Sequence, residues 1–544
     1  MCGIHCYCNA AEYSVPDGLK QASETIKHRG PDDYEEPRET IKDVYMSFHR
    51  LRINGLNSSS NQPLTLGSCT LICNGEIYNH HELGKQFNFK FSTQSDCEVI
   101  LHLFSRFGIQ GTVERLHGVY AFVLTDSTTG KLYAGRDTIG VRPMFWGNKR
   151  NGSLVFCSEA KGCWPLADAD TIQQFPPSSY LVGAQQPSGR WEYSIEEFEE
   201  KFDLTDYLTG DMHADIRNLV TTSVKDRCLM SDRKVGVFLS GGLDSTLVAR
   251  IAKDHLPEVH SFAIGLEGSP DLKFAAMAAA EIGTVHHEIV TSHEEIQLAL
   301  KKLIWHLETP DITTIRASLP MYLLSKHIKN KTDITVMLSG EGPDEVFSGY
   351  MYNHLAPSCE ALHENAVWRT KQLHLYDVLR SDRATAAWSL EVRVPFLDTK
   401  LVRYVLGLDP KLRDPKHNKN IEKYLLRKSF QGAISDQLLW RPKEAFSDGV
   451  GYSMVDGLKQ LAKKSCFGAQ IADYKHMQPQ TQEAALYREI YNTFYGRITA
   501  PLVKEFWMPC WTDEHSGDPS ATKLSIHKDL IAIKNEKQAS KLDE

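Results

Sequence analysis

The sequence predicts an α+β layered domain followed by an α/β domain whose parallel sheet is doubly wound, with helices on both faces. Two observations support this. Before about residue 185, strand-like runs mix with one helical stretch, whereas beyond about residue 212 buried strand-like runs alternate with helical ones. The length of 544 residues suits about two to four domains, each with its own core. After about residue 355 the pattern becomes mostly helical.

Strands in the first domain are expected where β-branched and aromatic residues alternate or cluster. A helix is predicted over 96–107, because apolar residues recur there at helical spacing and Ser95 or Asp96 is placed to cap it. The strand-like runs and the hairpin turn expected between two of them are Thr70–Cys73, Val119–Leu124, Leu154–Phe156 and, for the turn, Ser127–Gly130.

Strands of the second domain are expected to be separated by helical stretches, which indicates a parallel sheet. The expected strands are Val235–Leu239, Ser261–Ile264 and Thr335–Leu338, and a helix is expected over 247–251. Turn formers and charged residues replace apolar periodicity between the domains. We therefore predict a first domain over 1–185, a linker over 186–212, a second domain over 213–524 and a solvated tail over 525–544.

Composition excludes several classes of protein. A net charge of −8 argues against a nucleic-acid binder, and no apolar run reaches the roughly 18 residues of a transmembrane helix. Met1–His5 lacks the basic flank and apolar core of a signal peptide, so we expect a cytosolic protein. The twelve cysteines include no C-x-x-C pair, and the spacings within Cys2–Cys8 and Cys69–Cys73 are not those of a common zinc site.

A nucleotide site is predicted in the loop Leu239–Ser245, which lies between a buried strand and a helix. Small residues let the backbone approach phosphate closely, and free N–H groups at a helix start attract anions. Ser240 and Ser245 add hydroxyl donors, and Asp244 is a candidate Mg²⁺ ligand. A plain glycine turn is the structural alternative. No G-x-x-x-x-G-K-[ST] motif occurs, which disfavours P-loop chemistry.

A second acidic loop, Ser339–Glu345, follows the strand expected at Thr335–Leu338. Loops at the carboxyl ends of parallel strands share one crevice. We therefore expect Asp244 and Asp344 to reach one metal–pyrophosphate group, although an exposed acidic turn is the alternative.

Cys2 is a candidate nucleophile. Once Met1 is removed, Cys2 carries both a thiol and a free α-amino group, and such an amine can act as the base for its own side chain. Attack on a carboxamide needs donors for the oxyanion, which Asn74 and Gly75 offer through a side-chain amide and a backbone N–H. A cysteine at position 2 proves little by itself, so the surrounding motifs decide the interpretation.

The chain resembles glutamine-hydrolysing asparagine synthetases over almost its whole length. The first group of motifs resembles a class II glutamine amidotransferase domain, an N-terminal-nucleophile hydrolase with αββα layers: Met1–Ile4, His28–Asp32, His49–Leu51, Asn74–Asn79 and Ser95–Asp96. The second group resembles the ATP-pyrophosphatase domain of that family: Ser240–Ser245, Pro270–Leu272, Thr313–Ser318, Ser339–Glu345, Glu391–Asp398, 441–449, Phe506–Pro509 and Asp518–Ser520.

The resemblance implies roles for the first domain. Cys2 would be the glutaminase nucleophile, with Asn74 and Gly75 as the oxyanion hole. Arg50 would bind the glutamine α-carboxylate through its planar fork. The remaining glutamine-binding residues implied by the family are Leu51, Arg52, Ile53 and Asn54 along the strand after the arginine, and Glu76 and Asp96 near the α-ammonium group.

For the second domain the resemblance implies ATP as a substrate and Mg²⁺ as a cofactor held by Asp244 and Asp344. Glu341 and Lys423 would serve the formation of a β-aspartyl adenylate, Lys423 by neutralising phosphate charge. The ATP-binding residues implied by the motifs are Leu239, Ser240, Gly241, Gly242, Asp244, Ser245, Ile264, Ser339 and Gly340. Pro343 departs from the family, which has serine there; proline lacks the N–H that could contact phosphate.

The reaction implied is synthesis of asparagine from aspartate and ATP with ammonia taken from glutamine, releasing AMP and pyrophosphate. The partners expected are these small molecules, with no nucleic acid or membrane; a homodimer is left open. Two alternatives stay open: another ATP-dependent amidotransferase or β-lactam-forming relative, and a catalytically inactive sensor of glutamine or nucleotide. The sensor should have lost Cys2, Asp244, Glu341 or Lys423, and all four are present.

Overall fold

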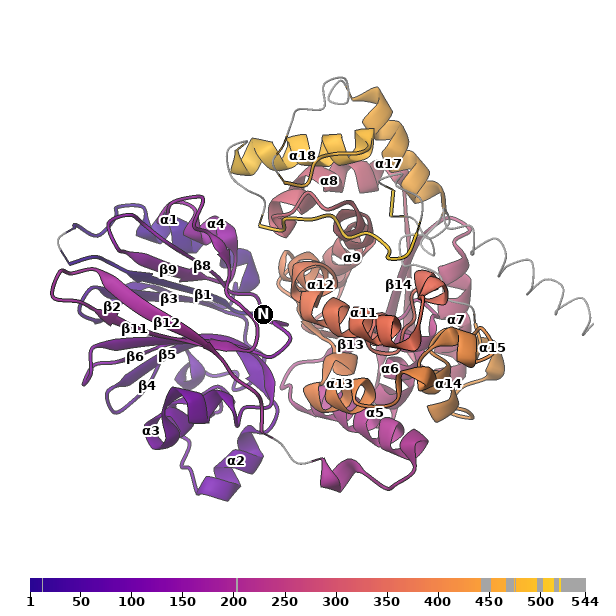
Figure 1. Ribbon diagram of the computed structural model, residues 1–544, viewed down its shortest axis with the longest axis horizontal. Helices are drawn as coiled ribbons and strands as arrows, with labels where there is room; N and C mark the ends of the chain where they lie inside the picture. The colour runs from indigo at the N-terminus through magenta and orange to yellow at the C-terminus, as the bar shows by residue number, and fades with distance from the viewer. Residues whose placement is uncertain are drawn as a thin grey trace, which may run out of the picture.

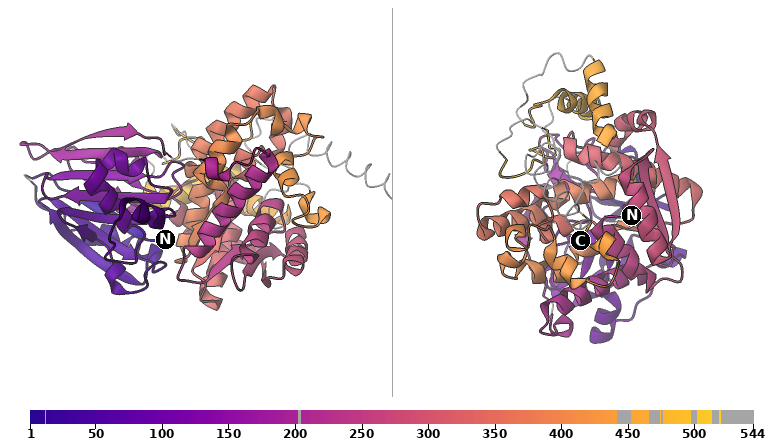
Figure 2. Two further views of the ribbon diagram at one scale, coloured as in Figure 1. Left: turned by 90° about the horizontal axis from the view of Figure 1, so that it is seen from below. Right: turned by 90° about the vertical axis from the view of Figure 1, so that its right-hand side faces the viewer.

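The computed structural model describes residues 1–11, 13–201, 204–441, 452–465, 474, 476–496, 502–512, 518 and 519. These residues form two layered units that lie side by side in Figure 1 and in the left view of Figure 2. The first unit is built around two antiparallel sheets, and the second around one parallel sheet. The two kinds of sheet agree with the predicted change from an α+β to an α/β domain.

The first unit is a sandwich of two six-stranded antiparallel sheets, in orders β10-β8-β9-β1-β3-β2 and β12-β11-β7-β6-β5-β4. The strands of the first sheet are β1 (Gly3–Cys8), β2 (Asp33–Ile41), β3 (Val44–Arg50), β8 (Phe145–Asn148), β9 (Leu154–Cys157) and β10 (Gln173–Gln174). Those of the second are β4 (Leu64–Leu66), β5 (Cys69–Ile77), β6 (Gly118–Asp126), β7 (Lys131–Arg136), β11 (Ser179–Gln185) and β12 (Trp191–Glu197).

Helices cover the outer face of each sheet. α1 (Leu19–Glu24) and α4 (Ala160–Cys163) contact the first sheet, whereas α2 (His80–Phe87) and α3 (Glu98–Val113) lie beside the second, where α3 contacts β4, β5 and β11 (Figure 1). Strands β1 and β3 face β5 across the sandwich. The order of layers is therefore αββα, as the resemblance implied.

The period-2 alternation of β1 decides where Cys2 points. Ile4, Cys6 and Cys8 lie in the apolar core between the sheets, whereas Tyr7 packs under the helices with Leu19 of α1. Cys2 has the same parity as Ile4 and also packs against the inter-sheet core. The nucleophile candidate therefore faces β5, the strand that carries the predicted oxyanion hole.

The second unit has a five-stranded parallel sheet in the order β15-β14-β13-β16-β17. The chain first builds β13, β14 and β15 outward and then returns to place β16 and β17 on the other side of β13, so the strand order reverses beside β13. Ligand crevices in open α/β sheets lie at such a point. The strands are β13 (Val235–Phe238), β14 (His260–Leu266), β15 (Val285–Thr291), β16 (Val336–Leu338) and β17 (Glu391–Arg393).

Helices flank this sheet in two packed groups. One contains α5 (Met212–Leu229), α6 (Leu243–Lys253) and α7 (Pro270–Ile282); the other contains α8 (His293–Leu307), α9 (Ile312–Lys331) and α12 (Asp377–Ala386) (Figure 1). The doubly wound arrangement is thus confirmed. The remaining helices are α10 (Pro343–Val346), α11 (Cys359–Gln372), α13 (Thr399–Leu406), α14 (Tyr424–Ser429), α15 (Asp436–Leu439), α17 (Tyr452–Lys464) and α18 (Gln482–Tyr495), which confirm the mostly helical C-terminal part.

Two local predictions were wrong. The expected linker over 186–212 contains β12, which pairs with β11 over its whole length, because Trp191, Tyr193 and Ile195 give a polar edge strand the period-2 pattern that its overall charge hides. Asp96 does not cap α3, whose N-cap is Cys97; its carboxylate instead accepts from the N–H of Ile77 at 2.6 Å.

The strands expected at 70–73, 119–124, 154–156, 235–239, 261–264 and 335–338 all correspond to strands in the structure, and the turn over 127–130 joins β6 to β7. The exact domain limits stay predictions. The motif at 442–449 and the tail over 525–544 lie outside the described residues. Among the helices that the structure describes, none is both long and apolar enough to cross a membrane.

Buried ion pairs join the two units. Arg29, fully buried in the first unit, binds Asp382 of α12 at 2.8 and 3.0 Å. Arg142 lies 3.2 Å from Glu391 of β17. Charged side chains this deeply buried are stable only when paired, so these contacts specify how the units dock.

Candidate active sites

Cys2 lies at the junction of the two units. Its Sγ is 3.7 Å from the carbonyl oxygen of Leu51, directly after β3. Met1 precedes it as a fully buried residue, and the Met1 amino group is 3.9 Å from Glu391 of the second unit. Burial raises the pKa of the Cys2 thiol to about 11, although the adjacent amino terminus opposes the shift. Burial also lowers the pKa of the Met1 amino group to about 6.

Asn74 and Gly75 lie on β5, which the sandwich brings opposite β1 and β3. The Asn74 Nδ2 is buried and has no hydrogen-bond partner among the described residues. An unsatisfied buried amide is costly, so it indicates a donor held ready for a ligand. Gly75 allows the close approach of β6, because a Cβ there would lie 2.6 Å from the Val119 carbonyl oxygen.

Arg50 ends β3 and is almost fully buried. Its guanidinium donates to carbonyl oxygens of the next loop, to Asn57 at 2.8 Å and to Asn54 and Gly55, and to the Asn61 side chain at 2.5 Å. The Arg50 guanidinium, predicted to bind the glutamine carboxylate, therefore holds the 54–61 loop in place in this structure.

Asn54, Glu76 and Asp96 form one polar cluster. The Asn54 Nδ2 donates to Glu76 at 2.6 Å and to Asp96 at 3.2 Å. Burial raises the pKa of Glu76 well above its ordinary value, and the neighbouring Arg393 opposes this shift. Two carboxylates on one amide are a suitable surrounding for an ammonium group, as the resemblance implied for Glu76 and Asp96.

The segment after Arg50, expected as a strand, is irregular because β3 ends at Arg50, and the other side chains predicted there to bind glutamine point elsewhere. Leu51 and Ile53 are buried in an apolar cluster that also contains Met1 and residues of the second unit. The Arg52 side chain forms a bidentate pair with Asp33 at 2.6 and 2.7 Å. Through their side chains, these residues belong to the interface and to the surface, so only their backbone is available to a ligand beside Cys2.

The predicted nucleotide loops line a cavity of about 260 Å³ at the carboxyl ends of β13, β14 and β16. Gly340 makes this possible, because a Cβ there would lie 2.9 Å from the backbone nitrogen of Ser245 in the other loop. Of the nine residues predicted to bind ATP, eight line the cavity: Leu239, Ser240, Gly242, Asp244, Ser245, Ile264, Ser339 and Gly340.

Gly241 is the exception. It has a φ of +70°, and a Cβ there would lie 2.3 Å from the backbone of Phe274 in α7. Glycine at this position therefore serves the tight turn and its packing on α7 and does not line the cavity. The loop's hydroxyls are oriented by one another, since the Ser240 and Ser245 Oγ atoms are 3.2 Å apart.

Lys423 lies between the two predicted metal ligands. Its Nζ is 2.6 Å from Asp244 Oδ2 and 2.8 Å from Asp344 Oδ1. One cation therefore reaches both carboxylates, and the second oxygen of Asp244 is buried without a hydrogen-bond partner among the described residues. Hard oxygen donors converging in this way fit Mg²⁺. Pro343 is accommodated at the first turn of α10, where a helix needs no N–H donor.

Sequence reasoning missed several charged residues of the cavity, and three arginines among them show this. Arg380 of α12, almost fully buried, is 2.7 Å from Glu341 and 2.7 Å from Asp377. Arg441 is 2.7 Å from Asp271, and Arg316 lines the same cavity. Asp271, Arg316 and Arg441 lie in motifs that the resemblance contains, which was the available signal; Arg380 stands in no motif.

Comparison with known proteins supports two units of this kind. A glutamine amidotransferase domain model matches residues 1–192, and an asparagine synthase model matches residues 215–365 and 356–507. The glutamine-hydrolysing asparagine synthetase of Gallus gallus is 40% identical, covering 98% of this chain and 100% of its own length. This chain belongs to the glutamine-hydrolysing asparagine synthetase family. The Homo sapiens member is also 40% identical, with 93% of this chain and 96% of that protein covered.

In this member of the asparagine synthetase family, the two groups of predicted site residues face one interface. Cys2, Met1 and Glu391 mark the side of the interface near the amidotransferase site. Ser339, which lines the ATP cavity, follows β16 and hydrogen-bonds through its N–H to the carbonyl of Arg393 at 2.9 Å. The strand β17 therefore lies between the two sites.

Proposed function

We propose that this chain synthesises asparagine from aspartate and ATP, using ammonia that it releases from glutamine, and that Cys2 and the 239–245 loop are its two reaction centres. The observation that carries the proposal is the coexistence of both sites in one chain of this family: a half-buried cysteine next to the N-terminus and a cavity lined by both predicted nucleotide loops. The first site releases the ammonia that the second site consumes.

At the first site the free α-amine of Cys2, exposed by loss of Met1, takes the thiol proton. The thiolate attacks the glutamine carboxamide carbon, and the oxyanion accepts from Asn74 Nδ2 and the Gly75 N–H. Collapse expels ammonia and leaves a thioester, which water hydrolyses to glutamate. Glu76 and Asp96 hold the substrate ammonium, and Arg50 exchanges a loop carbonyl for the substrate carboxylate.

At the second site the carboxylate of aspartate attacks the α-phosphate of ATP, which releases pyrophosphate and forms β-aspartyl-AMP. This step is needed because a carboxylate is a poor electrophile until its oxygen becomes a good leaving group. Ammonia then attacks the activated carbonyl and AMP leaves. Lys423 neutralises phosphate charge, Glu341 is oriented by Arg380, and the N-terminus of α6 faces the phosphates.

Asp244 and Asp344 are the residues proposed to hold Mg²⁺. When bound, Mg²⁺ supplies charge neutralisation for the pyrophosphate leaving group. Lys423 then has to leave at least one of the two carboxylates it now bridges, which frees its ammonium for the phosphate chain.

Ammonia has to cross the interface unprotonated. Leu51, Ile53 and Val119 of the first unit share one apolar cluster with the core of the second unit. We propose that ammonia passes along this apolar boundary, where exclusion of water also protects the acyl-adenylate.

A cytosolic location and a homodimer are further proposals. Fractionation of source cells tests the first, and light scattering on the purified protein tests the second. An inactive sensor is the rival function, and the retained Cys2, Asp244, Glu341 and Lys423 disfavour it.

The deciding experiment incubates the protein with aspartate, ATP, Mg²⁺ and glutamine and identifies every product. We expect asparagine, glutamate, AMP and pyrophosphate in equal amounts. ADP and phosphate as products would overturn the adenylate chemistry, and no turnover by a folded protein would favour the sensor.

A further inference from the structure

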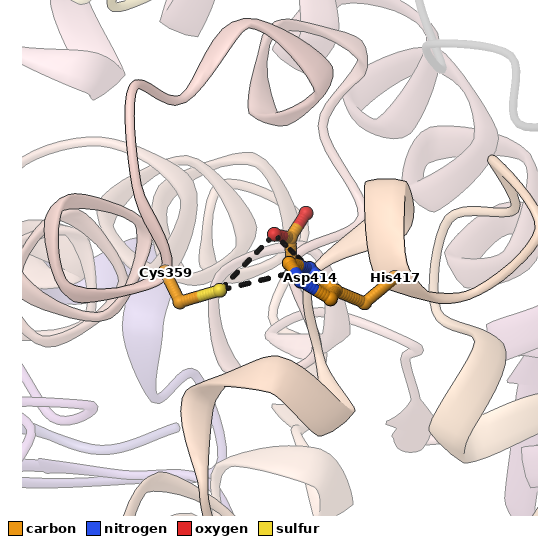
Figure 3. A group of neighbouring side chains, drawn as sticks. All are labelled: Cys359, Asp414 and His417. Atoms are coloured by element: carbon orange, nitrogen blue, oxygen red, sulfur yellow. Dashed lines mark hydrogen bonds and ion pairs between the residues drawn. The ribbon is translucent and has the colours of Figure 1, made fainter.

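Cys359, Asp414 and His417 converge at a point outside both reaction centres (Figure 3). Cys359 is the first residue of α11, and His417 ends the short 3-10 helix Pro415–His417 that Asp414 caps. The Cys359 Sγ lies 3.2 Å from Asp414 Oδ2 and 3.7 Å from His417 Nδ1, and those two atoms are 2.8 Å apart. None of the three lines the ATP cavity.

We propose that this cluster is a zinc site. Thiolate, imidazole and carboxylate are the ligand types that zinc combines, and their mixture disfavours Mg²⁺ and Ca²⁺, which prefer oxygen alone. The separations in sequence are 55 and 58 residues, so no local spacing signals the site. Among the described residues this is the group whose three donor atoms lie close enough together to hold one ion.

The geometry suits a tetrahedral ion. With Zn–S near 2.3 Å and Zn–N and Zn–O near 2.0–2.1 Å, neighbouring donors lie about 3.3–3.6 Å apart. The two distances from sulfur, 3.2 and 3.7 Å, bracket this range. The pair of Asp414 and His417 has to open by about 0.5 Å when an ion replaces their shared hydrogen bond, a small change because His417 is half exposed.

The surroundings fix the ligands and leave the ion accessible. Asp414 Oδ1 accepts from the N–H of Lys416 at 2.9 Å, which turns Oδ2 towards the cluster. The Lys416 ammonium is held away by the Ala356 carbonyl at 2.6 Å. The His417 side chain is 53% exposed, against 5% for Asp414, so the fourth position opens to water.

Binding releases one proton. The Cys359 S–H now donates to Asp414, and Zn²⁺ replaces that proton, which leaves to solvent as the thiolate coordinates. The neutral His417 ring, whose Nδ1–H now donates to Asp414, moves its proton to Nε2, so that Nδ1 can coordinate the ion. The ion would tie the start of α11 to the segment that leads from Asp414 towards Lys423. We therefore infer a structural zinc that stabilises this connection rather than a further reaction centre.

The test measures zinc by mass spectrometry after the full-length protein is loaded with ZnCl₂ and desalted. We expect one equivalent bound, and a loss of about tenfold or more in affinity for Cys359→Ser and for His417→Gln. Cobalt substitution should give a thiolate charge-transfer band that Cys359→Ser abolishes. Cys510→Ser is the control, because Cys510 is a more exposed cysteine than the buried Cys359 and lies outside the cluster.

A second measurement separates a zinc ligand from a structural hydrogen bond. Zinc should raise the melting temperature of the wild type and of Cys510→Ser but not of Cys359→Ser or His417→Gln. The proposal is overturned if the protein binds no zinc, or if both cluster variants retain zinc and the cobalt band unchanged. Lower stability of the variants with no zinc effect in the wild type would also overturn it.

Discussion

The Arg393 guanidinium of the synthetase unit lies 3.1 Å from the Glu76 carboxylate of the amidotransferase unit. Both side chains are almost fully buried. The same arginine binds Glu391 at 2.8 Å through Nε, and its backbone carbonyl accepts from the N–H of Ser339 in the ATP cavity. One residue thus touches the glutamine cluster through its side chain and the nucleotide loop through its backbone.

Arg393→Met should destabilise the protein by about 3–5 kcal/mol, because it leaves buried carboxylates unpaired. Adding Glu76→Gln to that variant should recover part of the loss, since one orphaned charge disappears. The measurement is urea denaturation of the wild type, both single variants and the double variant. Simple additivity of the two single effects would show that the ion pair carries no coupling.

Cys2→Ala should abolish glutamine-dependent asparagine synthesis, by at least about a thousandfold, because it removes the nucleophile. Ammonia-dependent synthesis should persist, since the ATP cavity lies in the other unit. The assay compares both nitrogen sources at saturating aspartate and ATP. A folded variant that lost both activities would contradict the division of labour between the two sites.

Asp244→Asn should have the reverse effect. Ammonia-dependent synthesis should fall by about a hundredfold, because one carboxylate beside Lys423 no longer carries charge. Glutaminase activity, measured as glutamate release, should stay within about twofold of the wild type, because a substitution at one site has little effect on a distant site. The Asp244→Asn variant should also need a higher Mg²⁺ concentration for half-maximal synthesis. The same Mg²⁺ dependence in variant and wild type would argue against Asp244 as a metal ligand.

A protein that retains Met1 should have no glutaminase activity. The retained methionine buries the amino terminus beside Glu391 and leaves the Cys2 thiol with a pKa of about 11, so little thiolate exists at neutral pH. Protein made with methionine aminopeptidase inhibited should release no glutamate, and treatment with the aminopeptidase before folding should restore activity. Intact mass distinguishes the two forms, and equal activity in both would exclude the α-amine as the base.

Stability should fall in acid through Glu391. Burial alone would raise its pKa, but Arg142 and Arg393 outweigh burial and hold the pKa below its ordinary value of 4.5. A carboxyl group whose pKa is lower in the folded than in the unfolded state stabilises the protein at pH values above the unfolded-state pKa. This contribution is lost as pH falls below about 4.5. Because the pKa of Glu391 is lowered to about 2, urea denaturation between pH 7 and pH 2 should show a weaker pH dependence for Glu391→Gln. An identical pH profile would contradict the assignment.

Much of this protein was predictable from local patterns. The strands were identified because alternation of apolar and polar residues, or a continuous apolar run, is a local property of the sequence. The loop at 239–245 was identified for the same reason, because small residues between a strand and a helix are also a local pattern. The edge strand β12 was missed because its charged composition resembles that of a linker. The role of Asp96 was missed because its position before a helix gives no information about the Ile77 N–H, nineteen residues away.

The sequence by itself determined the two kinds of domain, the family and the candidate groups at each site, because these follow from residue types and their order. Only the tertiary structure decided that Lys423 bridges Asp244 and Asp344, that Arg380 orients Glu341, and that Arg393 reaches Glu76. Each of these contacts joins residues from separate elements. Such pairs form when strand order and domain docking bring distant segments together, and no local spacing encodes that distance.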